Sequence, residues 1–354
     1  MAQRVIVGMS GGVDSAVTAL LLQQAGYEVI GVTLRTWESD DGTESRCCEI
    51  DDARDTARQL GIQYYAFNCL SDFRRHVVSP FVEAYLHGRT PNPCVNCNRF
   101  VKWERMIYYA NILKAELIAT GHYAFVVRLN NGRYTLRKAA FAQKDQSYML
   151  WQLTQEQLSR TLMPLGSLSK QEVRRIAEKE GISVAEKPDS QEICFVPDGS
   201  YADFVQSAAG IDLPQTGNFV DEQGKILGRH KGIIHYTVGQ RKGLGIALGE
   251  PVFVREIRAG SNEVVLGRAD SLLRGEIFCR RLNFLGVDDL PIGHSLRANV
   301  KIRYHDGGTW GIMTRTASDA LRIAFESPVR APAPGQSAVF YDEVGCVLGG
   351  GEIC

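Results

Sequence analysis

The sequence lacks the features that would place the protein in a membrane or a secretory pathway. No apolar run is long enough to cross a bilayer. The first residues, MAQRVIVGMSGG, have no basic region, no long apolar stretch and no small-residue cleavage site, so we expect them to form a buried strand rather than a signal peptide. These absences predict a cytoplasmic protein with no membrane partner.

The sequence also lacks a net charge and a disulfide framework. Its 40 Lys and Arg residues balance 40 Asp and Glu residues, so a nucleic-acid partner would have to bind a local basic face. Nine cysteines, an odd number, are scattered along the chain, unlike the dense, even set of a secreted disulfide-rich domain. We therefore expect most thiols to be structural, including the adjacent pair Cys47 and Cys48.

What the sequence does contain is a change of pattern near residue 200. Before it, β-rich runs alternate with helical patterns, as in RVIVGM followed by VDSAVTALLLQQAG, which predicts a parallel sheet covered by helices. Within that part, Asn131-Gly132 predicts a hairpin with a two-residue turn. After about residue 211 the sequence is glycine-rich, and from about residue 275 evenly spaced strands indicate a small antiparallel barrel or sandwich.

With 354 residues the chain is long enough for two or three domains. The pattern predicts an α/β fold with a parallel-sheet domain at residues 1–205, followed by two smaller, mainly β domains. The first of these is a small β-rich region at 206–273, and the last is a β-barrel at 274–354.

The segment SGGVDS, Ser10 to Ser15, lies between the first predicted strand and a helix expected to begin near Val13. Glycines there let backbone N–H groups approach an anion, and a helix N-terminus favours negative charge. The spacing of a Walker A loop and its lysine are absent. A Gly-Gly turn alone is usually a packing device, but Ser-Gly-Gly-x-Asp-Ser after a first strand resembles the PP-loop of the ATP pyrophosphatases.

That resemblance implies an enzyme that binds ATP, attaches AMP to an oxygen of its substrate and releases pyrophosphate. It places Ser10, Gly11, Gly12, Asp14 and Ser15 at the pyrophosphate, with Mg²⁺ offsetting the negative charge. The substrate stays open, because PP-loop enzymes do several different jobs. A ligase that amidates a small carboxylate and a non-catalytic RNA-binding or sulfur-carrier protein are therefore two alternatives to sulfur insertion.

Two cysteines three residues apart follow a proline-rich turn in GRTPNPCVNCNRFVKW. Taken alone, Cys94 and Cys97 fit half a zinc site, a redox pair, cluster ligands or unrelated thiols. Zinc is disfavoured because no second Cys-x-x-Cys or His pair accompanies them. A helix start at Cys97 would lower its pKa through the helix dipole. Taken alone, Cys194 in KPDSQEIC is typical of a buried structural thiol.

Together, segments between Val5 and Ile353 resemble the tRNA-specific 2-thiouridylases of the MnmA family. They are GMSGGVDSAV, GRTPNPCVNCNRFVKW, ATGHY, KDQSYMLWQL, KPDSQEICFVPDGSY, YTVGQRKGLGI and PGQSAVFYDEVGCVLGGGEI. The family resemblance implies that ATP adenylates the C2 oxygen of the wobble uridine of a tRNA. Sulfur then replaces that oxygen to give 2-thiouridine, and AMP leaves.

The resemblance also assigns roles to individual residues. Cys97 takes the position of the nucleophile, and Cys194 takes the position of the persulfide, whose sulfur a cysteine desulfurase or relay protein would supply. The two thiols could close a disulfide between turnovers. The further positions that would contact the nucleotide are Gly8, Met9, Val13, Leu34 and Gly121.

The predicted tRNA surface combines basic and aromatic residues. Residues 229–245, RHKGIIHYTVGQRKGLG, hold four Lys and Arg, two His and no carboxylate, a composition that suits an RNA backbone and unstacked bases. The resemblance adds positions in contact with tRNA, namely His122, Lys144, Asp145, Gln146, Arg303, Tyr304 and Gln336. It also implies that the target base is lined by Asn92, Pro93 and Cys94.

One departure from the family pattern leaves the sulfur chemistry open. In much of the family an aspartate stands at the position of Cys94, so the role of that aspartate cannot be carried over. A Cys-x-x-Cys pair with a third cysteine is a plausible ligand set for a 4Fe-4S cluster. Two routes therefore remain, a cluster held by Cys94, Cys97 and Cys194, and a persulfide route that uses Cys97 and Cys194.

Overall fold

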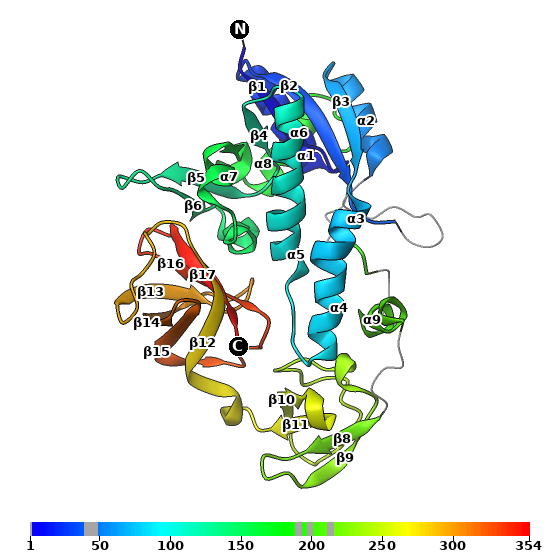
Figure 1. The fold of residues 1–354 in the computed structure, drawn as a ribbon. Coiled ribbons are helices and arrows are strands. Elements are labelled where there is room, and N and C mark those ends of the chain that lie inside the picture. The colour runs from blue at the N-terminus through cyan, green and yellow to red at the C-terminus, as the bar shows by residue number, and fades with distance from the viewer. Residues whose placement is uncertain (1, 39–48, 188–192, 197–200, 211–215) are drawn as a thin grey trace.

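A computed structural model describes residues 2–38, 49–187, 193–196, 201–210 and 216–354. Cys47 and Cys48 lie outside these residues. The chain forms an α/β domain, a small β-rich region and a closed barrel, in that order (Figure 1). Among the residues described, no helix is both long and apolar enough to cross a membrane.

The first domain is built on a five-stranded parallel sheet in the order β3-β2-β1-β4-β7. Val5, Ile6 and Val7 of the central strand are fully buried, as expected for a parallel sheet covered on both faces. The strands are β1 (Arg4–Gly8), β2 (Glu28–Arg35), β3 (Gln63–Asn68), β4 (Leu117–Ala119) and β7 (Thr161–Leu162). The predicted parallel sheet is confirmed.

The strand order determines where this sheet can bind a ligand. Since β2 lies on one side of β1 and β4 on the other, the order of the strands reverses at β1. Ligands of open parallel sheets bind at such a switch point, beyond the carboxyl ends of the strands. The two loops that meet there are residues 9–12, which leave β1, and residues 120–123, which leave β4.

Two helical runs extend from the sheet toward the other domains (Figure 1). Each contains a π-helical turn, a rare feature that is frequent at functional sites. The first run is α3 (Leu70–Phe73), η1 (Arg74–Val78) and α4 (Ser79–Leu86), and the second is α5 (Pro93–Asn96), η2 (Cys97–Trp103) and α6 (Glu104–Ile112). The other α-helices are α1 (Val13–Gln24), α2 (Ile50–Gln59), α7 (Gln155–Ser159), α8 (Lys170–Lys179) and α9 (Tyr201–Ala209).

A hairpin formed by β5 (Ala124–Arg128) and β6 (Tyr134–Lys138) projects from the α/β domain. The prediction of a hairpin is correct, but its two-residue turn is wrong. Residues 129–133 form the loop, in which the N–H of Gly132 donates to the carbonyl of Leu129 at 2.9 Å. The Asn131 side chain accepts from the N–H of Arg133 at 3.1 Å, and such local bonding by Asn stabilises longer loops as well as tight turns.

The two remaining parts are mainly β-structure. The central region has a four-stranded sheet in the order β10-β11-β8-β9, and the last part is a closed barrel in the order β12-β15-β14-β13-β16-β17. The central strands are β8 (Gly217–Val220), β9 (Ile226–His230), β10 (Phe253–Arg258) and β11 (Glu263–Gly267). The barrel strands are β12 (Leu273–Phe284), β13 (Ser295–Lys301), β14 (Thr309–Ala317), β15 (Ala320–Arg330), β16 (Ser337–Tyr341) and β17 (Val347–Ile353). Short 3-10 turns are η3 (Ala142–Lys144), η4 (Ser147–Leu150), η5 (Pro164–Ser167), η6 (Ile233–His235), η7 (Ala259–Ser261) and η8 (Asp270–Leu272).

The barrel is fixed to the α/β domain by buried hydrogen bonds. Tyr148 donates to the carbonyl of Ser337 at 2.7 Å, and Nε1 of Trp151 donates to the Ser337 hydroxyl at 2.9 Å. The N–H of Thr90 donates to the carbonyl of Pro334 at 2.8 Å. These bonds place the start of β16 against the loop that leads into α5.

Candidate functional site

The loop Met9–Gly12 leaves the carboxyl end of β1 at the switch point. The N–H of Met9 donates to the carbonyl of Val32 at 2.8 Å, and the Thr33 hydroxyl donates to the carbonyl of Met9 at 2.6 Å. These bonds fasten the start of the loop to β2. Gly8, the last residue of β1, and Met9, both predicted to contact the nucleotide, therefore lie at the switch point.

Local hydrogen bonds close the loop at residues 10–15. The Ser15 hydroxyl accepts from the N–H of Ser10 at 3.2 Å and donates to the carbonyl of Gly12 at 2.9 Å. Gly11 has a φ of +78°, and a Cβ there would lie 2.7 Å from the carbonyl oxygen of Glu49. Glycine is therefore required at Gly11 both for its backbone conformation and for space.

Asp14, in the first turn of α1, is the charged group of this loop. Nζ of Lys170 lies 2.8 Å from both carboxylate oxygens of Asp14, and the Tyr123 hydroxyl donates to Oδ1 at 2.7 Å. Lys170 is the first residue of α8, and its side chain is 13% exposed. The sequence analysis did not identify Lys170, which lies in none of the quoted segments, or Tyr123, which ends the segment ATGHY but has no neighbour in sequence that predicts a bond to Asp14.

Gly121, on the loop after β4, packs directly on the start of α1. A Cβ at this position would lie 2.9 Å from the carbonyl carbon of Asp14 and 3.0 Å from the nitrogen of Ser15. Leu34 lies near the carboxyl end of β2, paired with Phe67 of β3, and its side chain is in the hydrophobic core. The structure thus brings the predicted nucleotide residues from three strands to one edge of the sheet.

A second ionic group lies beside the loop. Nζ of Lys187 contacts the carboxylates of Glu49 and Asp52. Burial opposes the charge of Lys187, but hydrogen bonds with Asp52 and Glu49 raise its pKa. Because the Glu49 backbone also faces Gly11, this group links the segment that leads toward Cys194 to the PP-loop. Sequence reasoning missed it.

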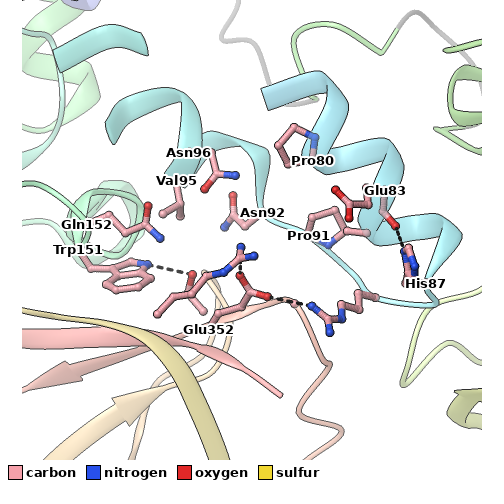
Figure 2. A pocket seen from close by; sticks show the side chains of 15 residues that line it. Pro80, Glu83, His87, Pro91, Asn92, Val95, Asn96, Trp151, Gln152 and Glu352 are labelled. Atoms are coloured by element: carbon pink, nitrogen blue, oxygen red, sulfur yellow. Dashed lines mark hydrogen bonds and ion pairs between the residues drawn. The ribbon is translucent and has the colours of Figure 1, made fainter. Parts of the chain in front are cut away.

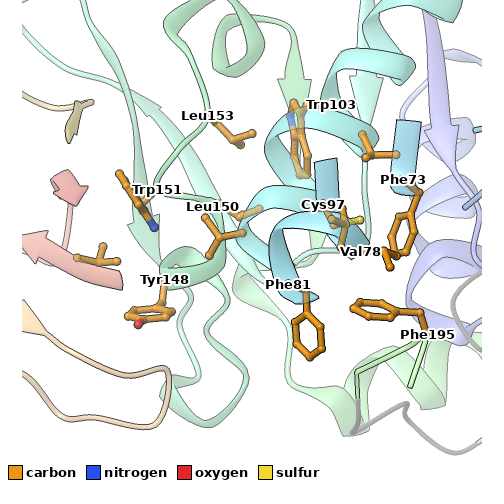
Figure 3. Close-up of a cluster of buried hydrophobic side chains, with 14 of the residues drawn as sticks. Phe73, Val78, Phe81, Cys97, Trp103, Tyr148, Leu150, Trp151, Leu153 and Phe195 are labelled. Carbon is orange, nitrogen blue, oxygen red and sulfur yellow. The ribbon is translucent and has the colours of Figure 1, made fainter. Parts of the chain in front are cut away.

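Cys97 and Cys194 pack against the same hydrophobic cluster, which Figure 3 shows around Cys97. Cys97 is 6% exposed, and Cys194 is half-buried. The residue after Cys194 holds this segment in place, because the Phe195 ring packs edge to face on Phe73 at 5.4 Å and on Phe81 at 5.2 Å. Cys97 and Cys194 thus both border this cluster, which extends from the α/β domain into the central sheet and the barrel.

Cys94 lies in a different environment from Cys97. It is exposed, and it is near enough to the barrel residue Tyr304 to influence it. The pKa of Tyr304 is raised by burial, by Asp145 and by Cys94, in that order. Within the described ranges, no three His, Cys, Asp or Glu side chains form a group able to hold a metal ion. The arrangement therefore gives no support to a cluster held by Cys94, Cys97 and Cys194.

The predicted helix start at Cys97 is wrong. Pro93 occupies the first helical position, which suits proline because the missing N–H has no partner there in any helix. Cys94 is therefore in the first turn, and Cys97 is one turn further, where η2 begins. Any benefit from the helix dipole falls on Cys94 rather than on Cys97.

His122, predicted to contact tRNA, lies beside the switch point. Its Nδ1 is 2.9 Å from the Thr120 hydroxyl, and its ring packs 5.3 Å from the Trp103 ring. Burial and the charge of Lys102 lower the pKa of His122 to about 3. The ring is therefore neutral at neutral pH and can bind RNA by hydrogen bonding or stacking, but not as a cation.

We expect His122 to make the protein less stable in mild acid. Its folded-state pKa of about 3 lies below the unfolded value of 6.5, so the unfolded chain binds the extra proton first and the free energy of unfolding falls as the pH drops below 6.5. The slope from this group is at most about 1.4 kcal/mol per pH unit. Urea unfolding between pH 7 and pH 4 should therefore show a smaller loss in His122→Gln than in the wild type. Equal losses would show that the pKa of His122 is not lowered in the folded state.

Asp145 proves to be a buried structural carboxylate. It is 5% exposed, and its oxygens accept from the N–H of Ala139 at 3.1 Å, the N–H of Ser147 at 3.2 Å and the Ser147 hydroxyl at 2.9 Å. The Ser147 hydroxyl lies 3.1 Å from the hydroxyl of the barrel residue Tyr341. Asp145 therefore shapes the loop that presents Lys144 and Gln146.

Asp145→Ala should destabilise the protein by about 2–4 kcal/mol, because buried donors would lose their acceptor. The measurement is urea unfolding at pH 7, with Asp203→Ala, in α9, as a control that lacks these bonds. A change below about 0.5 kcal/mol would leave direct RNA contact as the only role for Asp145.

The other predicted tRNA residues lie on both sides of the junction between the α/β domain and the barrel. Lys144 and Gln146 are half-buried, and the Gln146 side chain accepts from the N–H of Tyr123 at 2.9 Å. The Arg303 guanidinium is exposed and donates to the carbonyl of Arg330 at 3.2 Å, and Gln336 donates to the carbonyl of Thr90 at 2.9 Å.

The predicted target-base residues are close to this junction. Nδ2 of Asn92 lies 3.3 Å from Sδ of Met149, Pro93 is buried, and Cys94 is exposed. Asn92 also faces a cleft between α5 and the barrel (Figure 2).

Three family models match the chain in succession. They are the tRNA methyl transferase HUP domain at residues 3–198, the tRNA methyl transferase PRC-barrel domain at 203–268 and the aminomethyltransferase beta-barrel domain at 274–353. Among solved structures, the U34-tRNA thiolase NcsA from Methanococcus maripaludis with its [4Fe-4S] cluster aligns with a TM-score of 0.36 at 18% identity, covering 58% of this chain and 64% of that one. That similarity is too low to support an argument.

Curated relatives match over their full length. The chain is 51% identical over 358 residues to the tRNA-specific 2-thiouridylase MnmA of Lachnoclostridium phytofermentans, with 99% of each chain covered. It is 47% identical to the protein of that name from Acetivibrio thermocellus, again with 99% of each covered. The Clostridioides difficile protein is 44% identical, with 100% of this chain and 98% of that one covered. The chain therefore belongs to the family of tRNA-specific 2-thiouridylases named MnmA.

Proposed function

We propose that this protein is an ATP-dependent tRNA 2-thiouridylase that converts the wobble uridine of its tRNA to 2-thiouridine. One observation carries the proposal. Residues 10–15 lie at the switch point of the α/β domain, and the core of the same domain holds Cys97 and the segment of Cys194. Family membership supports the same activity. The proposal includes the division into domains at 1–205, 206–273 and 274–354.

In the first step, the C2 oxygen of the uridine attacks the α-phosphorus of ATP. A bond forms between that oxygen and the phosphorus, and pyrophosphate leaves. Backbone N–H groups of the Ser10–Ser15 loop and the start of α1 would bind the leaving phosphates. Lys170 can offset the charge that develops there. Mg²⁺ would neutralise further charge, and the partly exposed Asp14 carboxylate is a suitable ligand, because Mg²⁺ favours one or two carboxylates plus phosphate oxygens.

In the second step, a persulfide on Cys194 delivers sulfur. Its outer sulfur attacks C2, and AMP leaves with the oxygen. The Cys97 thiolate then attacks Sγ of Cys194, which breaks the persulfide bond and leaves the outer sulfur on C2. The products are 2-thiouridine and a Cys97–Cys194 disulfide, which a thiol reductant must reduce before the next turnover. A cysteine desulfurase or a relay protein would reload Cys194.

The cluster route remains a prediction without structural support. Since the described residues do not gather Cys94, Cys97 and Cys194 as a metal-binding group, we derive no step through a cluster. Contacts of tRNA with His122, Lys144, Gln146, Arg303, Tyr304 and Gln336, and of the target base with Asn92, Pro93 and Cys94, belong to the proposal. Asp145 enters it as the residue that shapes the Lys144–Ser147 loop.

The test is a thiolation assay with the full chain, a tRNA carrying a wobble uridine, ATP, Mg²⁺ and a cysteine desulfurase with cysteine. We expect 2-thiouridine by nucleoside mass spectrometry, with AMP and pyrophosphate formed in equal amounts. The assay is repeated anaerobically after reconstitution with iron and sulfide. ATP consumption that needs ammonia and no tRNA would instead support an amidating ligase. Binding of tRNA without AMP formation would support a non-catalytic role.

A further inference from the structure

A cleft of about 220 Å³ lies between the α/β domain and the barrel (Figure 2). One wall is α5 with the loop before it, and another is formed by Trp151 and Gln152. The barrel contributes residues around the start of β16 and the end of β17. The cleft thus lies beside the segment that carries Cys94 and Cys97, on the face of α5 that bears Asn92, Val95 and Asn96.

Three side-chain amides line this cleft, those of Asn92, Asn96 and Gln152. Oε1 of Gln152 is buried and has no hydrogen-bond partner in the described part of the chain. A buried acceptor of this kind is rare in folded proteins, and because it has almost no accessible surface, a ligand in the cleft would meet it only after the Gln152 side chain turns. Amides with free donors and acceptors are the side chains that recognise the edges of nucleic-acid bases.

The rim of the cleft carries two arginines held by one carboxylate. Nη1 of Arg281 lies 3.0 Å from Glu352, and Nη1 of Arg89 lies 3.7 Å from the same side chain. The two arginine side chains are 67% and 54% exposed. The cleft is also lined by Glu83 of α4, so its two arginines and two carboxylates balance, but both arginines can still donate to a phosphate, because each guanidinium has five N–H donors.

The geometry of α5 relates the cleft to the proposed target-base site. Residues two apart on a helix point to different faces, so Asn96 and Cys94 lie on different sides of one helical turn, and Asn92 stands at the beginning of that turn. An RNA strand with its target base against Cys94 would run past the start of α5. Its next base would then reach Asn96 and Gln152.

We propose that this cleft binds one unstacked nucleotide next to the target uridine. Asn96 and Gln152 read its base edge, and Arg89 and Arg281 hold its phosphates. The inference rests on the proposed function, because it takes the same RNA strand as its ligand. It adds a site of sequence selection that lies apart from the reacting atoms.

The first test measures thiolation of anticodon stem-loop RNAs that keep the target uridine and vary the neighbouring nucleotide on either side. We expect the wild type to prefer one base at one of these positions by about tenfold or more in kcat/KM. Gln152→Ala and Asn96→Ala should reduce that preference to about threefold or less, while Gln24→Ala, an exposed glutamine at the end of α1, keeps it. Circular dichroism confirms that each variant is folded.

The second test needs no turnover. An RNA with 2-aminopurine at the preferred neighbouring position should gain fluorescence on binding the wild type, because the base leaves its stack, and gain less with Gln152→Ala. Two results together would overturn the inference and leave the proposed function intact. They are equal thiolation of all the RNAs, whichever neighbouring base they carry, and unchanged fluorescence. No thiolation of any RNA would count against the proposed function, while the fluorescence change would still decide whether the cleft takes a base.

Discussion

Replacing either Cys97 or Cys194 by serine will lower the formation of 2-thiouridine by about 1,000-fold or more, because each thiol makes or breaks a bond to the transferred sulfur and a hydroxyl cannot. The adenylation step should survive, since neither thiol makes or breaks a bond in that step. The measurement is nucleoside mass spectrometry of the tRNA alongside tRNA-dependent exchange of labelled pyrophosphate into ATP. We expect exchange within about threefold of the wild type in both variants.

The matched control is Cys354→Ser, which changes an exposed thiol at the last residue of the chain. It should thiolate tRNA as the wild type does. If Cys97→Ser loses both pyrophosphate exchange and thiolation, the substitution disturbs the fold, because Cys97 is buried in the shared core. Full thiolation by Cys194→Ser would contradict the persulfide role of Cys194.

Cys94→Ala separates the two sulfur routes. On the persulfide route, the variant keeps thiolating when a cysteine desulfurase supplies sulfur, because Cys94 is exposed and takes no part in the bonds that change. On the cluster route, it loses both bound iron and activity. Iron content and 2-thiouridine measured on one anaerobic preparation therefore decide between them.

The parts of the site that sequence reasoning found are those with a local signal. The alternation of strands and helices and the Ser-Gly-Gly-x-Asp-Ser turn are short-range patterns, and both appear in the structure where they were expected. The start of the helix at Pro93 also has a local signal, namely proline at a first helical position, but the cysteine spacing drew attention to Cys97 instead.

The parts that were missed depend on contacts between distant segments. Lys170 meets Asp14 across 156 positions of sequence, and Lys187 meets Glu49 across 138. Lys170 lies in none of the quoted segments, and Lys187, although it begins the segment KPDSQEIC, has no neighbour in sequence that predicts its carboxylate partners. Asp145 is the opposite case. The family resemblance predicted that it contacts RNA. In the structure it is buried and accepts three hydrogen bonds from its own loop, which gives it a structural role. Burial of a charged residue follows from tertiary packing and cannot be seen in its neighbours in sequence.

Lys170→Met will lower tRNA-dependent exchange of pyrophosphate into ATP by about 100-fold, the usual loss when one preorganised charge is removed from a developing anion. Lys170 binds both oxygens of Asp14 at 2.8 Å. In the proposed mechanism Asp14 would become a ligand of Mg²⁺ when ATP binds, and Lys170 would then offset the charge of the pyrophosphate. The prediction tests this role of the lysine.

The control for this prediction is Lys179→Met, an exposed lysine in the last turn of the same helix, which should leave exchange unchanged. Asp14→Asn should lower exchange by about 100-fold or more on its own, and the double variant should lose less than the product of the two single effects, because the two side chains form one unit. Exchange by Lys170→Met within about threefold of the wild type would show that the lysine only holds Asp14. Independent effects that multiply in the double variant would show that the two residues act on different steps.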